Sequence, residues 1–171
     1  MAALVLTQCE AFDNEPPGLP GAVVSAAAHL PGGLWLAALA LAVPGVDRLP
    51  LTLGLMSRRT IPRATVLRWA APARRDARVR ADLRSHIRPA SARRQEDTTQ
   101  RLQRFRGRAL VCWTVDDAVM PSRHGPMLRD LLDAQLVVLP RSRTLVPIDA
   151  PLTLAGHVRA YLDRAPRSDP S

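Results

Sequence analysis

The chain has 171 residues, of which 47% are hydrophobic, and this composition is too apolar for a disordered polypeptide. One compact domain with its own core is expected at this length. The formal net charge of +9 would favour nucleic acid or an anionic surface as a partner. All 24 basic residues are arginine, however, a bias typical of a GC-rich genome, so net charge alone does not identify a partner.

The excess positive charge lies in residues 58–108. This stretch holds 16 arginines against four acidic residues, a local balance of +12, which leaves −3 for the rest of the chain. A charge run of this kind is more often a solvated helical face than a binding stripe. The aromatic content of 4% also argues against a base-stacking surface. An Arg-rich nucleic-acid-binding protein without catalysis is therefore kept only as the alternative interpretation.

The cysteines and the apolar runs exclude several classes of protein. Cys9 and Cys112 stand apart, without a CxxC motif or a neighbouring histidine, so we expect reduced core thiols and no metal. The first six residues lack the charged start of a signal peptide. The apolar run 34–43 has ten residues, where a membrane span needs about 20. These features predict a cytoplasmic protein with no membrane partner.

The predicted elements begin with a strand at 2–7, a continuous apolar run of the kind that is buried on both faces of a parallel sheet. Proline-separated helices are then predicted at 22–29, 34–42, 63–70, 74–87 and 91–105. After them the pattern changes to a strand at 109–113, a helix at 123–132, a strand at 136–139 and an amphipathic helix at 152–162, with Leu154, Val158, Tyr161 and Leu162 as its apolar face. Alternating strands and helices imply a short parallel sheet, so the expected fold class is α/β with about three strands.

Ligands gather at the carboxyl ends of parallel strands, so the segments that follow the predicted strands are the first candidates for a site. They are 7–14, 114–121 and 141–151, and the second contains the Asp-x-x-x-Pro turn Asp117-Ala118-Val119-Met120-Pro121. With this turn, the strand end Leu4-Val5-Leu6-Thr7 and a helical insertion between them, the chain resembles the α/β-hydrolase superfamily, particularly haloalkane dehalogenases and esterases, over nearly its whole length.

The resemblance implies a partial α/β-hydrolase fold with a helical cap insertion. In that organisation, a first core strand and corner occupy 1–14, a helical cap-like region 15–105, a C-terminal α/β core 106–165 and a flexible tail 166–171. Cap residues, especially the run 34–43, would line the pocket, which implies a small apolar substrate. No cofactor is implied.

Asp117 is the residue that the resemblance assigns to the triad acid. A carboxylate at that corner accepts the N–H of the catalytic imidazole and stabilises the imidazolium that forms during proton transfer. Asp116 is the alternative. Either aspartate could instead close a turn before the helix at 123–132.

The position of the general base is occupied by a threonine. The resemblance places the base about seven residues before the proline that opens the last helix, and counting back from Pro151 leads to Thr144. A hydroxyl cannot shuttle a proton near neutral pH as imidazole can. Surface or cap positions are expected for the four histidines, none of which follows a predicted strand: His29, His86, His124 and His157. His124 is the one that could approach the acid corner.

The nucleophile is missing from this sequence, because no Gly-x-Ser/Asp/Cys-x-Gly elbow occurs in it. The first hypothesis is a truncated or degenerate hydrolase of ester, haloalkane or epoxide type that is inactive by itself. The second is that Met1 is an internal residue of a longer hydrolase whose nucleophile lies upstream. A first strand without a neighbour on one side would also leave an exposed edge through which the chain could self-associate.

Overall fold

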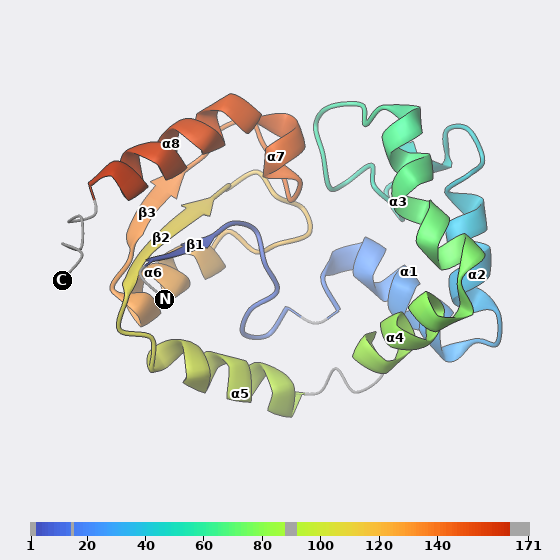
Figure 1. Ribbon diagram of the computed structural model, residues 1–171, viewed down its shortest axis with the longest axis horizontal. Helices are drawn as coiled ribbons and strands as arrows, with labels where there is room; N and C mark the ends of the chain where they lie inside the picture. Colours follow the sequence, from blue (N-terminus) through green and yellow to red (C-terminus); the bar gives the residue numbers. More distant parts are fainter. Residues whose placement is uncertain (1–2, 15, 88–91, 165–171) are drawn as a thin grey trace, which may run out of the picture.

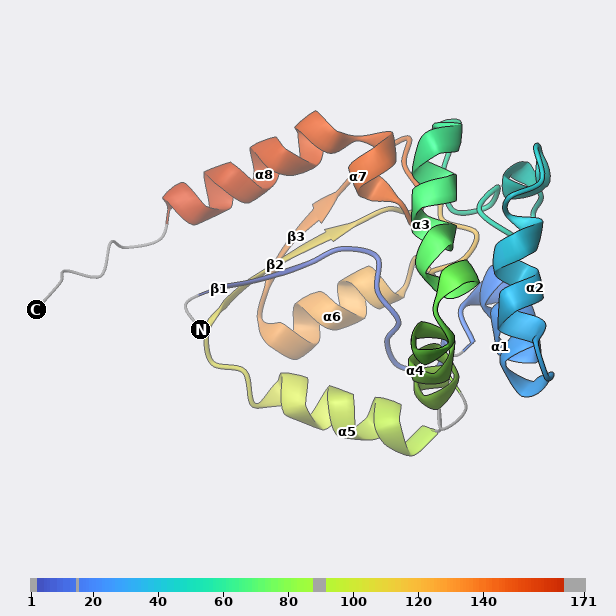
Figure 2. The same cartoon turned by 45° about the vertical axis from the view of Figure 1, so that its right-hand side comes forward.

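The structure is a computed structural model that describes residues 3–14, 16–87 and 92–164. Figures 1 and 2 show two regions side by side: a layered α/β unit around a small sheet, and a group of helices beyond the carboxyl ends of the strands. The sheet has three strands, and all pairings within it are parallel. The predicted α/β class with about three parallel strands is therefore confirmed.

The strand order is β1-β2-β3, with β1 at Ala3–Leu6, β2 at Arg108–Trp113 and β3 at Gln135–Val138. Each predicted strand is confirmed to within a residue at both ends, and Ala2 lies outside the described residues. In the register, Val5 lies beside Leu110 and Val111 lies beside Leu136. β2 is therefore the central strand, paired on both sides.

The core is built on β2, whose side chains alternate between the two faces of the sheet. One buried cluster contains Leu110, Cys112, Leu139, Val146 and Tyr161, and the other contains Val111, Trp113, Val119, Met120 and Leu128. By contrast, all four residues of β1 are only half-buried. Among the described residues β1 has a strand on one side alone, so the predicted full burial of this segment is wrong.

Helices cover both faces of the sheet (Figure 1). On one side lie α5 (Ala92–Gln103) and α6 (His124–Leu132), and on the other lie α7 (Val146–Asp149) and α8 (Pro151–Asp163). α8 packs Leu154, Val158 and Tyr161 against the core. Leu162 was predicted on the same apolar face but is 48% exposed, because one step along a helix turns a side chain by about 100°.

The second region consists of α1 (Gly18–His29), α2 (Gly33–Ala40), a short 3₁₀ turn (Val46–Arg48), α3 (Arg63–Arg75) and α4 (Ala77–Ile87). The predicted helices exist with shifted ends. α3 was expected to stop at residue 70 but continues through Pro72, because a proline in the last turn removes only one backbone hydrogen bond. The four-part domain division remains a prediction, and its tail, 166–171, lies outside the described residues.

Candidate active-site corner

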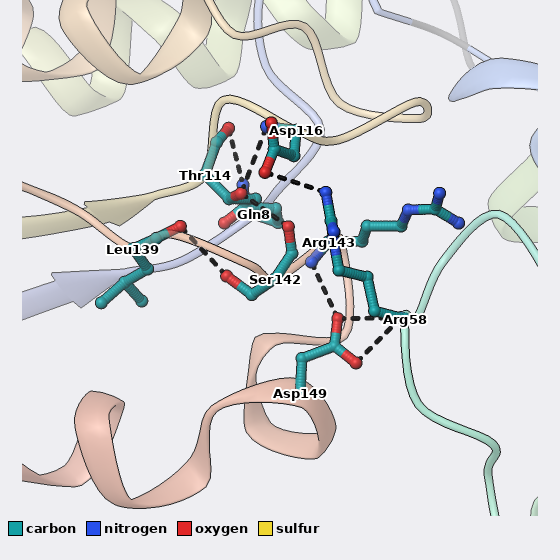
Figure 3. A network of polar contacts seen from close by, with 8 residues as sticks. All are labelled: Gln8, Arg58, Thr114, Asp116, Leu139, Ser142, Arg143 and Asp149. Carbon is teal, nitrogen blue, oxygen red and sulfur yellow. Dashed lines mark hydrogen bonds and ion pairs between the residues drawn. The ribbon is translucent and has the colours of Figure 1, made fainter.

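Buried hydrogen bonds tie the three strand ends together, as Figure 3 shows. Gln8 Nε2 donates to the Thr114 carbonyl at 3.4 Å, and Thr114 Oγ1 donates to the Ser142 carbonyl at 2.7 Å. Ser142 Oγ in turn donates to the Leu139 carbonyl at 3.2 Å. Thr114 and Ser142 are fully buried, so these bonds replace water and hold the corners in fixed relative positions.

Asp117 and Thr144 meet at this edge of the sheet. Thr144 Oγ1 donates a hydrogen bond to Asp117 Oδ1 at 2.8 Å. The same carboxylate oxygen accepts the backbone N–H groups of Val119 at 2.8 Å and Met120 at 3.2 Å, which closes the turn after β2. Asp117 Oδ2 is buried and has no hydrogen-bond partner among the described residues. One carboxylate oxygen is thus fully used, while the other is a buried acceptor without a donor.

The neighbouring aspartate takes a different role. Asp116 Oδ2 lies 2.9 Å from an Arg58 guanidinium nitrogen, and both side chains are 43% exposed. An exposed ion pair of this kind contributes at most about 1 kcal/mol. Asp117, and not the alternative Asp116, is therefore the aspartate that contacts Thr144.

Asp149 anchors the loop that carries Thr144 to the helical region (Figure 3). Its carboxylate accepts the Ser57 hydroxyl at 2.6 Å and the backbone N–H groups of Arg58, Arg59 and Arg143 at 2.8–3.1 Å. Burial by itself would raise the pKa of Asp149, but these hydrogen bonds outweigh it and hold the pKa below its usual value. The ionised carboxylate therefore joins residues 57–59 to the corner that follows β3.

A cavity of about 500 Å³ adjoins the Asp117 turn. Val119 and Met120 line it from the turn, Val24, Ser25 and His29 line it from α1, and Ile87 lines it from α4. None of residues 34–43 lines this cavity. The expectation that this apolar run faces the pocket is wrong here, because most of the run belongs to α2, which lies on the outer side of α1 and α3 in both views.

Comparisons with known proteins support the architecture. No protein-family model and no curated protein matches the sequence. Among solved structures, an α/β hydrolase fold protein from Burkholderia ambifaria aligns with 95% of the chain at 22% identity and a TM-score of 0.65, covering 57% of that protein. A membrane phospholipase A described as a bacterial virulence factor aligns with 97% at 14% identity and a TM-score of 0.59, covering 50% of that protein. A thermophilic esterase from Thermogutta terrifontis aligns with 95% at 16% identity and a TM-score of 0.51, covering 56% of that protein.

The chain has part of the α/β-hydrolase fold. It spans between 50% and 57% of the lengths of these three structures. At these identities the structural similarity shows the fold alone. It does not assign roles to individual residues.

Within this hydrolase fold, one histidine is placed differently from its prediction. His124 is fully buried, so the surface or cap position expected for it is wrong. Its Nε2 lies 3.0 Å from Asp13 Oδ1, and its ring packs edge-on to Phe12 with centroids 5.2 Å apart. The hydrogen bond with His124, assisted by Arg123, holds the pKa of Asp13 below its usual value. His124 therefore pairs with the corner after β1 and not with Asp117.

The remaining histidines and the cysteines fit their predictions more closely. His29, His86 and His157 are exposed. Both cysteines are free thiols, but Cys112 is buried and Cys9 only half-buried. Burial, with a smaller contribution from Glu10, raises the pKa of Cys9 to about 11, so its thiol stays protonated. In the described ranges no group of three or more His, Cys, Asp or Glu side chains could hold a metal, and no helix has the length and apolarity to cross a membrane.

Proposed function

We propose that this chain is the acid-and-cap part of an α/β hydrolase of ester, haloalkane or epoxide type, with Asp117 at the acid position and Thr144 at the position of the base. The observation that carries the proposal is the 2.8 Å hydrogen bond from Thr144 Oγ1 to Asp117 Oδ1. In a hydrolase triad, an imidazole N–H donates to the carboxylate in the same way. The corner retains the contact between acid and base but has lost the base's ability to accept a proton.

This arrangement predicts binding without turnover. A threonine hydroxyl is neither a general base nor a general acid near neutral pH, so Asp117 and Thr144 cannot activate a nucleophile. The sequence also contains no nucleophile elbow. A nucleophile acting with Asp117 would have to come from another polypeptide segment. Even then, the site would have no imidazole at position 144 to activate it.

The proposed ligand is a small apolar molecule held in the cavity beside the Asp117 turn. Its volume of about 500 Å³ falls within the usual range for small-molecule sites. Several lining residues supply apolar contacts, among them Val24, Ile87, Val119 and Met120. Polar side chains also line the cavity: Glu10, Ser25, His29 and His86.

Filling the cavity should abolish binding. We expect the purified chain to bind a short-chain p-nitrophenyl ester without releasing p-nitrophenol above the buffer rate. Val24→Trp should weaken that binding about tenfold or more, because the indole occupies the space of the ligand. Val138→Trp on β3 is the matched control, since Val138 is 51% exposed and Val24 is 41% exposed. Ester turnover that disappears in Asp117→Asn would contradict the proposal.

Restoring an imidazole tests the acid position directly. In Thr144→His, the carboxylate of Asp117 should raise the pKa of the new imidazole above its ordinary value of about 6.5, because an adjacent negative charge favours the imidazolium. The pKa can be followed by NMR titration of the ring protons, with exposed His157 as an internal reference. Adding Asp117→Asn should remove the increase. An imidazole whose pKa does not depend on Asp117 would contradict the assignment of Asp117 to the acid position.

The alternative of nucleic-acid binding gains no support from the arginine contacts. Arg63 donates to the Leu41 carbonyl, Arg80 to the Ala73 carbonyl and Arg84 to the Ala28 carbonyl. These guanidinium groups satisfy helix ends and loops within the chain. Nucleic-acid binding therefore stays a prediction from charge alone.

A further inference from the structure

The outer side of α2 is an apolar surface that faces solvent. α2 carries no polar side chain, and its inner side, with Leu34 and Ala38, is buried. Four large side chains lie on the opposite side and are between 37% and 57% exposed: Trp35, Leu36, Leu39 and Val43. Their spacing places them on one side of the helix and its continuing turn, and we call them the α2 outer face. A helix that is apolar on all sides is normally covered by other protein or by lipid. We therefore expect a partner to cover this face.

The location of this face separates it from the candidate site. In both views α2 lies at the end of the molecule opposite the sheet and α8 (Figures 1 and 2). The segment after α2 also exposes apolar side chains, since Leu49 and Leu51 are each about half exposed. Trp69 on the adjoining α3 is 46% exposed. Two of the three tryptophans of the chain thus lie on neighbouring helices with their rings partly in water.

The charge around the α2 outer face restricts what can cover it. Residues 30–75 contain seven arginines and one acidic residue, Asp47, which is buried. Arg48 in the 3₁₀ turn after α2, and Arg68 on α3, which packs against α2, are both exposed. A second copy docked about a two-fold axis would bring this positive surface against itself. The partner must therefore combine an apolar interior with negative charge.

We propose that the α2 outer face docks onto an anionic lipid bilayer, with its four apolar side chains in the interfacial layer and nearby arginines among the headgroups. Tryptophan favours this interface, and arginine can lay its aliphatic stem along apolar surface while its guanidinium reaches phosphate. Apolar side chains at a protein surface can insert into the interfacial layer, and anionic lipid strengthens such binding through nearby basic residues. The absence of a membrane partner was predicted from the ten-residue length of the apolar run, which excludes a span and does not bear on surface attachment.

Vesicle co-sedimentation of the full chain tests this proposal. We expect binding to phosphatidylcholine vesicles that contain phosphatidylglycerol, much weaker binding to phosphatidylcholine alone, and weakening by added salt. Leu36→Gln and Leu39→Gln should each lower the partition coefficient about tenfold, because an apolar contact is replaced by an amide. Arg48→Gln should lower it about fivefold on the anionic vesicles only. Leu162→Gln is the matched control on α8, since Leu162 has comparable exposure, and it should leave binding unchanged.

The fluorescence of Trp35 reports on the same face independently of sedimentation. Anionic vesicles should shift the tryptophan emission to shorter wavelength, and Trp35→Phe should remove most of the shift. The proposal would be overturned if lipid binding did not depend on phosphatidylglycerol. It would also be overturned if Leu36→Gln and Leu39→Gln left lipid binding unchanged. A concentration-dependent dimer that these two variants abolish would overturn it as well, because the face would then belong to a second copy. Salt-sensitive binding of duplex DNA in place of vesicles would likewise assign the basic surface to nucleic acid.

Discussion

Replacing Trp113 with alanine is expected to lower the free energy of unfolding by about 3–5 kcal/mol. The indole is 1% exposed, and it packs in the cluster that joins β2 to α6. Gly125 on α6 approaches it so closely that a Cβ at that position would lie 2.5 Å from Trp113 Cγ. Urea denaturation followed by circular dichroism measures the loss. The cavity left by the indole cannot close without moving α6 toward the sheet, so the loss should fall in the upper part of this range.

Trp69→Ala is the control for this large effect. Trp69 is 46% exposed, so its removal should cost no more than about 1 kcal/mol. Trp113→Phe keeps an aromatic ring in the core but removes the hydrogen bond that Trp113 Nε1 donates to the Pro121 carbonyl at 3.2 Å. That variant should lose about 1 kcal/mol through the missing hydrogen bond, in addition to the loss from the smaller ring. Equal losses for Trp69→Ala and Trp113→Ala would show that the core is not centred on β2.

The second large effect is expected at Asp149. Asp149→Asn should lower the free energy of unfolding at neutral pH by about 2–4 kcal/mol, because an amide cannot accept the hydroxyl and the three backbone N–H groups that the carboxylate accepts. The loop that carries Thr144 should loosen as well, since Arg143 N–H loses its acceptor. Hydrogen exchange of the Arg143 amide measures that second consequence.

The effect at Asp149 should depend on pH in a definite direction. The pKa of Asp149 is depressed in the folded chain, so its contribution to stability is fully present above the unfolded pKa of about 3.9 and is lost as pH falls through the lower folded pKa. The stability difference between the wild-type chain and Asp149→Asn should therefore shrink in acid. Asp130→Asn is the control, because the Asp130 side chain is 68% exposed and pairs with Arg129 at the surface. A difference that stayed constant into strong acid would contradict the assigned network.

Local patterns predicted most of the elements. Continuous apolar runs identified all three strands, because a strand in a parallel sheet is apolar on both sides. Proline and glycine separated the helices, although α3 passes through Pro72. The four-residue helix α7 was missed, because one turn is too short to carry a helical period. Local patterns did not select Asp117 and Thr144: the resemblance to α/β hydrolases implied both positions, and the fold brings the two side chains into contact.

Pairings between distant segments were beyond the reach of these patterns. His124 and Asp13 are 111 positions apart, and no spacing rule links a helix start to a loop after the first strand. The Asp149 network joins residues 57–59 to 143 for the same reason. An apolar run also does not indicate which of its sides will be buried. The exposure of Trp35 and Leu36 could therefore not be predicted from the sequence.

The order of residues along the chain therefore specified the strands and most of the helices, because these elements depend on neighbours within a few positions. Only the tertiary packing decided that Thr144 donates to Asp117, that His124 is buried against Asp13 and that one side of α2 faces solvent. The physical reason is that burial and hydrogen-bond partners are properties of the assembled layers, in which segments remote in sequence become neighbours.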